Sequence, residues 1–341
     1  MSLRTTVVVP TYNRSASLLV TLAGLARQEG AADWEVVIVS DGSTDDTASV
    51  VQAFAATAPF PVRFYEQTNA GPARARNRGV AEARGEIIIF VDDDVEPSPQ
   101  FVARHVAHHD AETSVAVVAP MRPDPLRRGD EPVWVGWEHA MLGRQYTAWA
   151  TGEWAGVGAH HFYTGNASVR REPFLAVGGF NETFGRQEDV ELAVRLETER
   201  GTRFRFDAEA FGTHRPTRTF ASWLRVPFAY GSLDVTRAQT DGGRTWERVR
   251  HGYYARNVVT RRLADLCLSR PMASGAVRNA LRGIAESLYK ARRDGVAFAA
   301  LSALYNVHYL EGAASALGSV AALRRVLTSA EGNGAGKAAT V

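Results

Sequence analysis

The sequence contains very little cysteine and very little lysine. Its 341 residues include one cysteine, Cys267, which excludes an intramolecular disulfide and a metal site built from several thiolates. Lysine occurs only as Lys290 and Lys337, so almost all of the basic residues are arginine. The formal net charge is +2, and without a strong basic field the chain is not expected to bind nucleic acid.

Long apolar runs are also absent. A membrane-spanning helix needs about 20 consecutive apolar residues, and the best candidate, Val296 to Leu310, contains His308 and is followed by Glu311. We therefore expect no spanning helix, although attachment to a membrane surface stays open. A strand pattern starts near Thr5 in place of a signal peptide, so we expect a cytoplasmic protein, with peripheral contact at the inner face of the membrane as an option.

Over the first 120 residues, short apolar runs alternate with helical patterns. The predicted strands are 5–9, 35–39, 62–65 and 86–91. The predicted helices between and after them start at Ser15, Ser43, Pro72 and Pro99. Strands that are apolar throughout belong to mostly parallel sheets with helices on both faces, which predicts an α/β fold. In such sheets a ligand binds beyond the carboxyl ends of the strands. We therefore expect the chemistry in the loops after Val9, Val39 and Val91.

The alternation breaks down between residues 120 and 163. This stretch holds four tryptophans, which could form a platform for a sugar or aryl acceptor or could pack in the interior: Trp134, Trp137, Trp149 and Trp154. A helix at 189–200 and a strand at 204–206 are expected after it.

Beyond Pro216 the pattern is helical nearly to Leu327, and the last ten residues have low hydrophobicity. We predict a catalytic domain at 1–215, a helical segment at 216–330 and a disordered tail at 331–341. The helical segment is rich in arginine and aromatic residues. Such a surface can bind anionic lipid headgroups, or it can pack against the catalytic domain or a second subunit as a homodimer.

Three consecutive carboxylates, Asp92, Asp93 and Asp94, follow directly after the predicted strand 86–91. Adjacent carboxylates repel one another, so the cluster is costly unless a cation compensates it. A hard divalent ion bound by carboxylate oxygens would do so, with a nucleotide diphosphate completing its shell. The alternative is a solvated acidic turn before the next helix, but the position at the end of a buried strand favours the metal site.

Four further groups of polar residues flank the other predicted strands and helices. Asp41 follows the second strand, where it can accept a hydrogen bond from a pyrimidine imide, and Tyr12 can flank the base. The arginines in 69–79 can bind phosphate, or they can lie on a solvated helix face. Glu188-Asp189 begins a helix, whose dipole would keep the Asp189 pKa low and suit it to act as a general base or merely as a cap. His214, after a strand, can complete a metal shell.

Taken in order, these motifs resemble the family 2 glycosyltransferases, which are inverting enzymes with the GT-A fold. The resemblance extends over about Arg4 to Arg215, with the motifs VVVPTYN, SDGSTDDT, NAGPARARN, FVDDD, TGNASVRREPFLAVGGF and QEDVELAVR, and then a histidine. It implies a GT-A catalytic domain, with a Rossmann-like, mostly parallel sheet, followed by the helical C-terminal segment. The QxxRW motif of processive members is absent after Asp189, which implies transfer of a single sugar.

The resemblance also implies a role for each motif residue. Asp92 would lie near the ribose and Asp94 on the metal, with Asp93 at the variable middle position. Residues assigned to the nucleotide are Asp41, which would read a uracil-type base, Pro10, Thr11 and Tyr12, which would line its pocket, and Arg76. Asp189 would be the catalytic base, Glu188 would hold sugar hydroxyls, and His214 would be a further metal ligand.

The expected activity is metal-dependent transfer of one sugar, with inversion, from a nucleotide-diphosphate sugar, expected to be a UDP-sugar. The cofactor would be Mn²⁺ or Mg²⁺. The acceptor is a glycan, a lipid-linked sugar or a small molecule, as in polysaccharide biosynthesis. Two alternatives are a sugar nucleotidyltransferase, which would need a Gly-rich basic loop that VVVPTYNRSAS lacks, and a degenerate binding protein, which would lack Asp92, Asp94 and Asp189.

Overall fold

The computed structural model describes residues 3–127, 130–240 and 243–329, and the predicted tail at 331–341 lies outside them. The chain forms two compact units, Met1–Leu126 with His139–Thr217, and Arg127–Glu138 with Arg218–Val341. One division of the chain, between Thr217 and Arg218, falls two residues after the boundary predicted at residues 215–216. Among the described residues, no helix has the length and apolarity needed to cross a bilayer.

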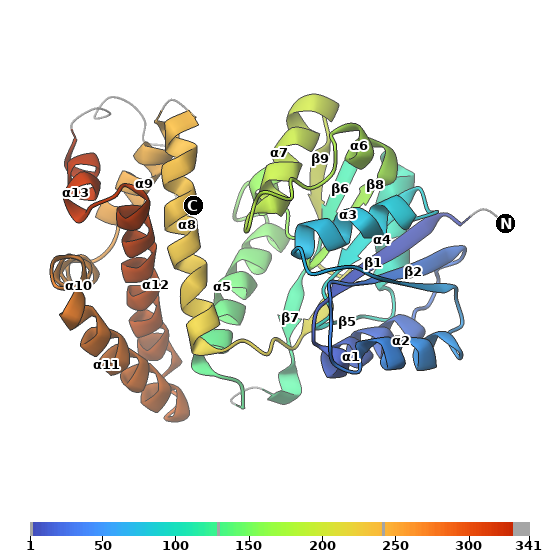
Figure 1. The fold of residues 1–341 in the computed structure, drawn as a ribbon, viewed down its shortest axis with the longest axis horizontal. Coiled ribbons are helices and arrows are strands. Elements are labelled where there is room, and N and C mark those ends of the chain that lie inside the picture. The colour runs from blue at the N-terminus through green and yellow to red at the C-terminus, as the bar shows by residue number, and fades with distance from the viewer. Residues whose placement is uncertain (1–2, 128–129, 241–242, 330–341) are drawn as a thin grey trace. The chain divides into compact units, whose positions relative to one another are not determined.

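The first unit is built on a seven-stranded sheet with the order β3-β2-β1-β4-β8-β6-β9 (Figure 1). The strands are β1 (Thr5–Thr11), β2 (Trp34–Ser40), β3 (Val62–Glu66), β4 (Ile87–Val91), β6 (Val115–Val118), β8 (Asn166–Arg170) and β9 (Arg203–Phe206). Neighbouring strands are parallel except on both sides of β8, which is antiparallel to β4 and β6. The sheet is therefore mostly parallel, as the apolar strand sequences predict.

Helices cover both faces of this sheet because successive strand residues point to opposite sides. Val7 and Val9 of β1 pack with side chains of α1 (Ser15–Ala26), α2 (Thr47–Ala55) and α4 (Phe101–Ala111). Val8, between them, packs on the other side with α3 (Pro72–Glu82), α6 (Arg171–Ala176) and α7 (Glu188–Arg200). The two apolar layers hold the sheet rigid beneath its polar loops.

A small second sheet lies beside the end of β4. It has the order β5-β10-β7, formed by β5 (Val95–Pro97), β10 (Gly212–His214) and β7 (Met121–Pro123). In its register His214 pairs with Val95, the residue that follows the three aspartates. This pairing brings a residue from late in the first unit to the end of β4.

The stretch 120–163, to which the sequence analysis assigned no helix, contains the 18-residue helix α5 (Val133–Ala150). The helix starts in the second unit and ends in the first. Trp134, Trp137 and Trp149 are buried, and Trp154 is partly exposed. The first three tryptophans therefore pack in the interior and do not form an exposed platform.

In its described residues the second unit consists mainly of helices. Besides the start of α5 it contains α8 (Phe220–Thr240), α9 (Arg244–Tyr254), α10 (Val258–Ser269), α11 (Pro271–Lys290), α12 (Asp294–Ala316) and α13 (Val320–Thr328), and α8, α9, α10, α12 and α13 share a core that includes Cys267. Helices α8 and α12 can lie close together because Gly231 and Gly312 have no Cβ atom. A Cβ atom at Gly231 would collide with the Tyr309 carbonyl, and one at Gly312 would collide with the Phe228 carbonyl. Two small residues thus set the spacing of the central helix pair.

Candidate active site

The candidate site lies at the carboxyl ends of three neighbouring strands. Strand β1 ends at Thr11, β2 at Ser40 and β4 at Val91, and the three run parallel. Their following loops therefore meet at the same edge of the sheet, where open α/β sheets bind their ligands. This edge carries Asp41, the selected residues at the end of β1 and the three aspartates after β4.

Two arginines compensate the acidic cluster after β4. Arg14 Nη1 lies 3.0 Å from Asp93 Oδ1 and 3.0 Å from Asp94 Oδ2. Arg76 Nη2 lies 2.7 Å from Asp92 Oδ1. The mutual repulsion that the sequence predicts is thus offset by guanidinium groups, and Asp92 still has 34% of its side chain exposed.

The middle carboxylate, Asp93, points back toward β1. Its Oδ2 accepts a hydrogen bond of 2.8 Å from Thr11 Oγ1, and its other oxygen contacts Arg14. Burial raises the pKa of Asp93 to about 6, although Arg14 opposes the shift. Both Asp93 and Thr11, which were assigned to the nucleotide, are engaged with each other between β1 and β4.

Asp94 and His214 converge from the two sheets. Asp94 Oδ1 lies 3.6 Å from His214 Nε2, and the backbone N–H of Arg215 donates to the Asp94 carbonyl at 2.8 Å. On its other side, His214 Nδ1 lies 3.3 Å from His139 Nε2 of α5. A partner on one ring nitrogen fixes the orientation of the ring and directs the other nitrogen toward Asp94.

Arg76 joins the acidic cluster to the start of α7. Its guanidinium contacts Asp92 and, through Nη1 at 3.3 Å, Glu188 Oε1. Burial alone would lower the pKa of Arg76, but the charges of Asp92 and Glu188 raise it. The Nε of Arg76 is buried without a hydrogen-bond partner in the structure. One buried cation therefore holds two motifs that lie 96 residues apart along the chain.

Asp189, the predicted base, is the second residue of α7, and its environment differs from the expectation. Its Oδ1 accepts a 2.8 Å hydrogen bond from the backbone N–H of Val190. The prediction that the helix dipole keeps the Asp189 pKa low is wrong. Burial, followed by the charge of Glu188, raises this pKa to about 6 and outweighs Val190 and Arg76. Desolvation by the surrounding protein atoms is the larger effect.

The backbone before α7 is held in an uncommon conformation. Gln187 has φ of 60°, in the left-handed region that few residues other than glycine adopt. Asn77 of α3 anchors the approach to it, because its side chain donates to the Phe180 carbonyl at 2.9 Å and accepts from the Phe180 N–H at 2.8 Å. Since Asn77 is adjacent to Arg76, α3 fixes both the segment before α7 and its first residue.

Asp41 is buried under the loop that leads into α3. Its Oδ1 accepts hydrogen bonds from Gln67 Nε2 at 2.8 Å and from the Ala70 N–H at 2.9 Å, and its Oδ2 accepts from the Gly71 N–H at 2.8 Å. A carboxylate oxygen can accept more than one hydrogen bond, so Oδ2 keeps capacity for a ligand donor. Nearby on β1 and its loop, Pro10 is buried and Tyr12 is 49% exposed.

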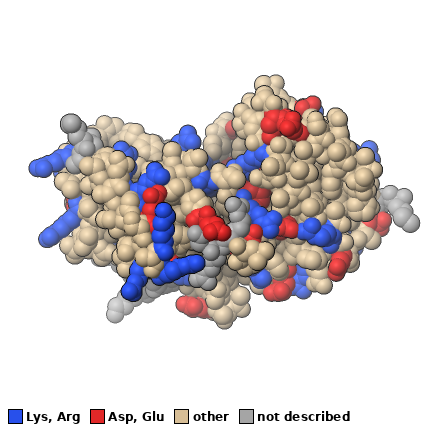
Figure 2. All heavy atoms as spheres, turned by 90° about the horizontal axis from the view of Figure 1, so that it is seen from below, with Lys and Arg blue, Asp and Glu red and all other residues tan. Residues whose placement is uncertain are grey.

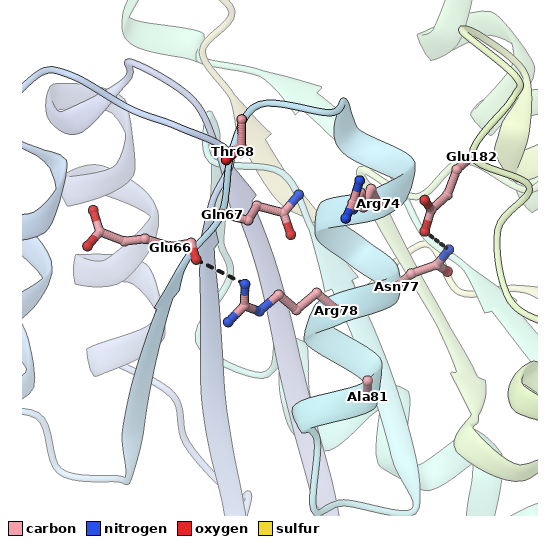
Figure 3. A pocket seen from close by; sticks show the side chains of 8 residues that line it. All are labelled: Glu66, Gln67, Thr68, Arg74, Asn77, Arg78, Ala81 and Glu182. Carbon is pink, nitrogen blue, oxygen red and sulfur yellow. Dashed lines mark hydrogen bonds between the residues drawn. The ribbon is translucent and has the colours of Figure 1, made fainter.

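The arginines of α3 divide between two sides of the helix. Arg76 faces the carboxylates, whereas Arg74 and Arg78 line a cavity of about 600 Å³ on the outer side (Figure 3). There Arg78 donates to the Glu66 carbonyl at 2.9 Å, and Asn77 donates to Glu182 at 3.0 Å. None of the residues assigned to the nucleotide, the metal or catalysis lines this cavity.

Two residues of the site were not selected from the sequence. Arg14 is a single basic residue in the loop between β1 and α1. The acidic cluster predicted at the end of a neighbouring strand could have indicated that Arg14 forms ion pairs there. His139 belongs to the helix that the sequence analysis did not predict, so no pattern pointed to its contact with His214.

The model of the family "Glycosyl transferase family 2" matches residues 6–177. The chain is 33% identical over 246 residues to validoxylamine A glucosyltransferase of Streptomyces hygroscopicus subsp. jinggangensis. This alignment covers 62% of this chain and 55% of that relative. The chain is also 30% identical over 234 residues to pre-mycofactocin glycosyltransferase of Mycobacterium tuberculosis, covering 66% and 46%. The chain thus spans about half the length of these relatives.

Solved structures share the fold. The mannosyltransferase PcManGT from Pyrobaculum calidifontis, in complex with GDP-Man and Mn²⁺, aligns with a TM-score of 0.60 and 24% identity over 90% of this chain and 87% of that one. Residues 1–349 of S. aureus TarS, in complex with UDP, align with a TM-score of 0.51 and 16% identity over 93% and 92%. These likenesses confirm the predicted GT-A fold. Since the family model covers 172 of the 341 residues, the chain belongs to glycosyl transferase family 2.

Proposed function

We propose that the chain is a metal-dependent, inverting glycosyltransferase that moves a single sugar from a UDP-sugar to an acceptor hydroxyl. The observation that carries the proposal is the bridge made by Arg76. This buried guanidinium contacts Asp92 of the acidic cluster and Glu188 at the start of α7. Donor and acceptor chemistry require these two motifs in one site, and the bridge keeps them there.

The donor nucleotide would lie along the loops of β1 and β2. Asp41 Oδ2 would accept a hydrogen bond from a ring imide, and the exposed ring of Tyr12 would stack on the base. Asp92, partly exposed beside Arg76, would accept from a ribose hydroxyl. GDP-Man is the ligand of PcManGT and UDP that of TarS, so both nucleotides belong in the test.

A divalent metal fits the pair formed by Asp94 and His214. Their facing atoms, a carboxylate oxygen and an imidazole nitrogen, are ligand types that Mn²⁺ accepts, and His139 holds the ring in place. Among the described residues, no three or more His, Cys, Asp or Glu side chains are grouped so that they could hold a metal. The donor's diphosphate and water would therefore supply the remaining ligands. When bound, the metal would neutralise charge on the departing diphosphate.

Asp189 would act as the general base. It would take the proton of the acceptor hydroxyl as the acceptor oxygen forms a bond to the anomeric carbon. The bond from that carbon to the diphosphate oxygen breaks, and the nucleoside diphosphate leaves with the electron pair. Attack from the side opposite the leaving group inverts the anomeric configuration. A base pKa of about 6 suits this step, because the carboxylate is ionised at neutral pH yet more basic than an exposed aspartate.

The proposal is tested by thermal unfolding of the full chain with UDP or GDP, each with Mn²⁺, with Mg²⁺ or with a chelator. A ligand that binds the folded state alone stabilises it by about 2.7 kcal/mol at 100 times its Kd. We expect the largest rise in Tm with UDP and Mn²⁺ together. Equal rises with metal and with chelator would contradict the metal site. A larger rise with GDP than with UDP would mean that the donor nucleotide carries guanine in place of uracil.

The variant His214→Ala separates metal binding from nucleotide binding. It should lose the additional stabilisation that Mn²⁺ gives in the presence of UDP and keep the stabilisation that UDP gives alone. His251→Ala, at an exposed position of α9 in the second unit, is the matched control and should behave as the unmodified chain.

A further inference from the structure

A second cavity lies within the helical unit, and none of the residues assigned to the nucleotide, the metal or catalysis lines it. It has a volume of about 520 Å³ and is bounded by the end of α9, by α10 and by α13. Three arginines line it, Arg261, Arg262 and Arg324, against a single carboxylate, Asp265. Its remaining walls include apolar and aromatic side chains such as Tyr254, Val258 and Leu327.

Among the described residues, the arginines of this cavity are not paired with carboxylates, although Arg324 Nη2 donates a hydrogen bond to Ser269 Oγ at 2.6 Å. Within the part of the chain that the structure describes, none of the three has an acidic partner within 4.0 Å. Asp265 instead faces the hydroxyl of Tyr253, at 3.3 and 3.4 Å. The Nε of Arg261 is buried without a hydrogen-bond partner, and its guanidinium lies 5.9 Å from the centre of the Tyr254 ring. A buried donor without a partner calls for an acceptor, which an anion would supply.

Exposed apolar side chains lie at this cavity and on a helix that bounds it: Tyr254 and Val258 line it, and Val259 and Leu266 belong to α10. Eleven large hydrophobic side chains are exposed among the described residues, and four of them fall between positions 254 and 266: Tyr254, Val258, Val259 and Leu266. Val259 is 68% exposed. An apolar rim of this kind beside arginines marks an interaction surface.

The charge of this region exceeds that of the whole chain. Residues 243–270 contain seven arginines and two acidic residues, a net charge of +5, whereas the whole chain carries +2. On the face drawn in Figure 2, Lys and Arg side chains project from the helical unit. A surface that combines positive charge with exposed apolar side chains is complementary to an anionic lipid bilayer.

We propose that this cavity binds the phosphate of an anionic lipid headgroup, with the apolar rim resting among the lipid chains. Arg261, Arg262 and Arg324 hold the phosphate through charge-assisted hydrogen bonds. Tyr254, Val258 and Val259 enter the interface beside it. This lipid site attaches the chain to one leaflet of the bilayer. It shares no residue with the candidate active site at the end of β4.

The test is sedimentation of the full chain with two kinds of vesicle. In one kind about one lipid in three is phosphatidylglycerol and the rest is phosphatidylcholine, and the other kind is phosphatidylcholine alone. We expect binding to the anionic vesicles that weakens as salt is raised. Each arginine near the surface changes the partition constant about fivefold, so Arg262→Gln with Arg324→Gln should lower it about 25-fold. Both side chains are exposed, so the fold is expected to be kept.

The matched control removes two exposed arginines of the same unit that do not line the cavity, Arg225→Gln with Arg293→Gln. It has the same net charge as the test variant and should keep most of the binding. Equal loss in both variants would overturn the proposal in favour of net charge alone. Absence of sedimentation with anionic vesicles would also overturn the proposal. If inorganic phosphate then raises the Tm, the ligand of the cavity is a soluble anion and not a lipid.

Discussion

At the scale of single residues, the environment moves the pKa values of three aspartates of the first unit in opposite directions. Burial raises the pKa of Asp93 and of Asp189 to about 6. Burial acts on Asp207 in the same direction, but hydrogen bonds from Arg104 and from the Glu209 backbone outweigh it and lower that pKa to about 2. Asp207 thus stays ionised at neutral pH and anchors α4 through Arg104 and His108, whereas Asp189 can exchange a proton near neutral pH.

The first prediction is that Asp189→Asn removes transfer activity and leaves donor binding nearly intact. The amide cannot accept the acceptor proton, and loss of general-base catalysis lowers the rate by about 10²–10⁴. Initial rates and UDP affinity measured side by side check this. Glu199→Gln, on the exposed part of the same helix, is the control. Retained activity in Asp189→Asn, or a loss of UDP affinity as large as in Asp94→Ala, would refute the assignment.

The second prediction concerns pH. The base must be ionised, so kcat/KM should rise with pH and level off above about 6, the pKa to which burial raises Asp189. The sign follows from protonation, because below this pH the carboxyl holds the proton that it must accept. The profile is measured from pH 5 to 8, where unfolding is monitored in parallel. A flat profile down to pH 5 would mean that the base has an ordinary pKa.

At the scale of elements, the contact between α4 and β8 is made by a buried polar network. His105 lies 2.9 Å from Ser168 Oγ and 3.0 Å from Asn166 Oδ1, and His109 lies 2.8 Å from Ser168 Oγ. Both rings are fully buried, and burial lowers their pKa values to about 4 and about 3. The network therefore requires neutral histidines.

The third prediction is that this network makes stability fall as pH decreases. In the unfolded chain a histidine takes up a proton near pH 6.5, whereas the folded chain resists until about pH 4 or 3. Stability is thus full above pH 6.5 and is lost as pH falls below it. Each histidine should contribute about 2 kcal/mol of loss between pH 7 and pH 5.

Urea unfolding at the two pH values checks the third prediction. Because Asp93 and Asp189 titrate in the opposite sense, the comparison is made with His109→Gln, whose loss between pH 7 and 5 should be about 2 kcal/mol smaller. His251→Gln, exposed on α9, should show the same pH dependence as the unmodified chain. An unchanged pH dependence in His109→Gln would show that the pKa of His109 is the same in the folded and the unfolded chain.

The elements that sequence could predict are those with a single dominant pattern. Strands β1, β2 and β4 are continuous apolar runs, and α7 was expected at 189–200 and observed at Glu188–Arg200. Strand β8 was not predicted, because its NASVR sequence uses polar side chains to contact His105 and His109. Asp92 to Asp94 were found because they follow a strand directly. Arg14 and His139 were not, because each is defined by a contact distant in sequence.

At the scale of the whole molecule, the two units have separate cores and separate groups of functional residues. The residues assigned to nucleotide, metal and catalysis all belong to the first unit. The cavity with three arginines belongs to the second, whose core includes residues of α8, α9, α10, α12 and α13. We therefore expect donor binding and lipid binding to be independent properties.

The last prediction follows from this division and is measured by hydrogen exchange of the full chain with UDP and Mn²⁺. Ligand binding suppresses local opening where the ligand is bound, so amides in the loops after β1, β2 and β4 should exchange more slowly. Peptides from α9, α10 and α13 should be unchanged, because none of the assigned donor residues lies there. Anionic vesicles should give the reverse pattern, with protection at α10 and α13. Equal protection of the helical unit by UDP would mean that this unit contributes to the donor site, and the separation of the two functions would be wrong.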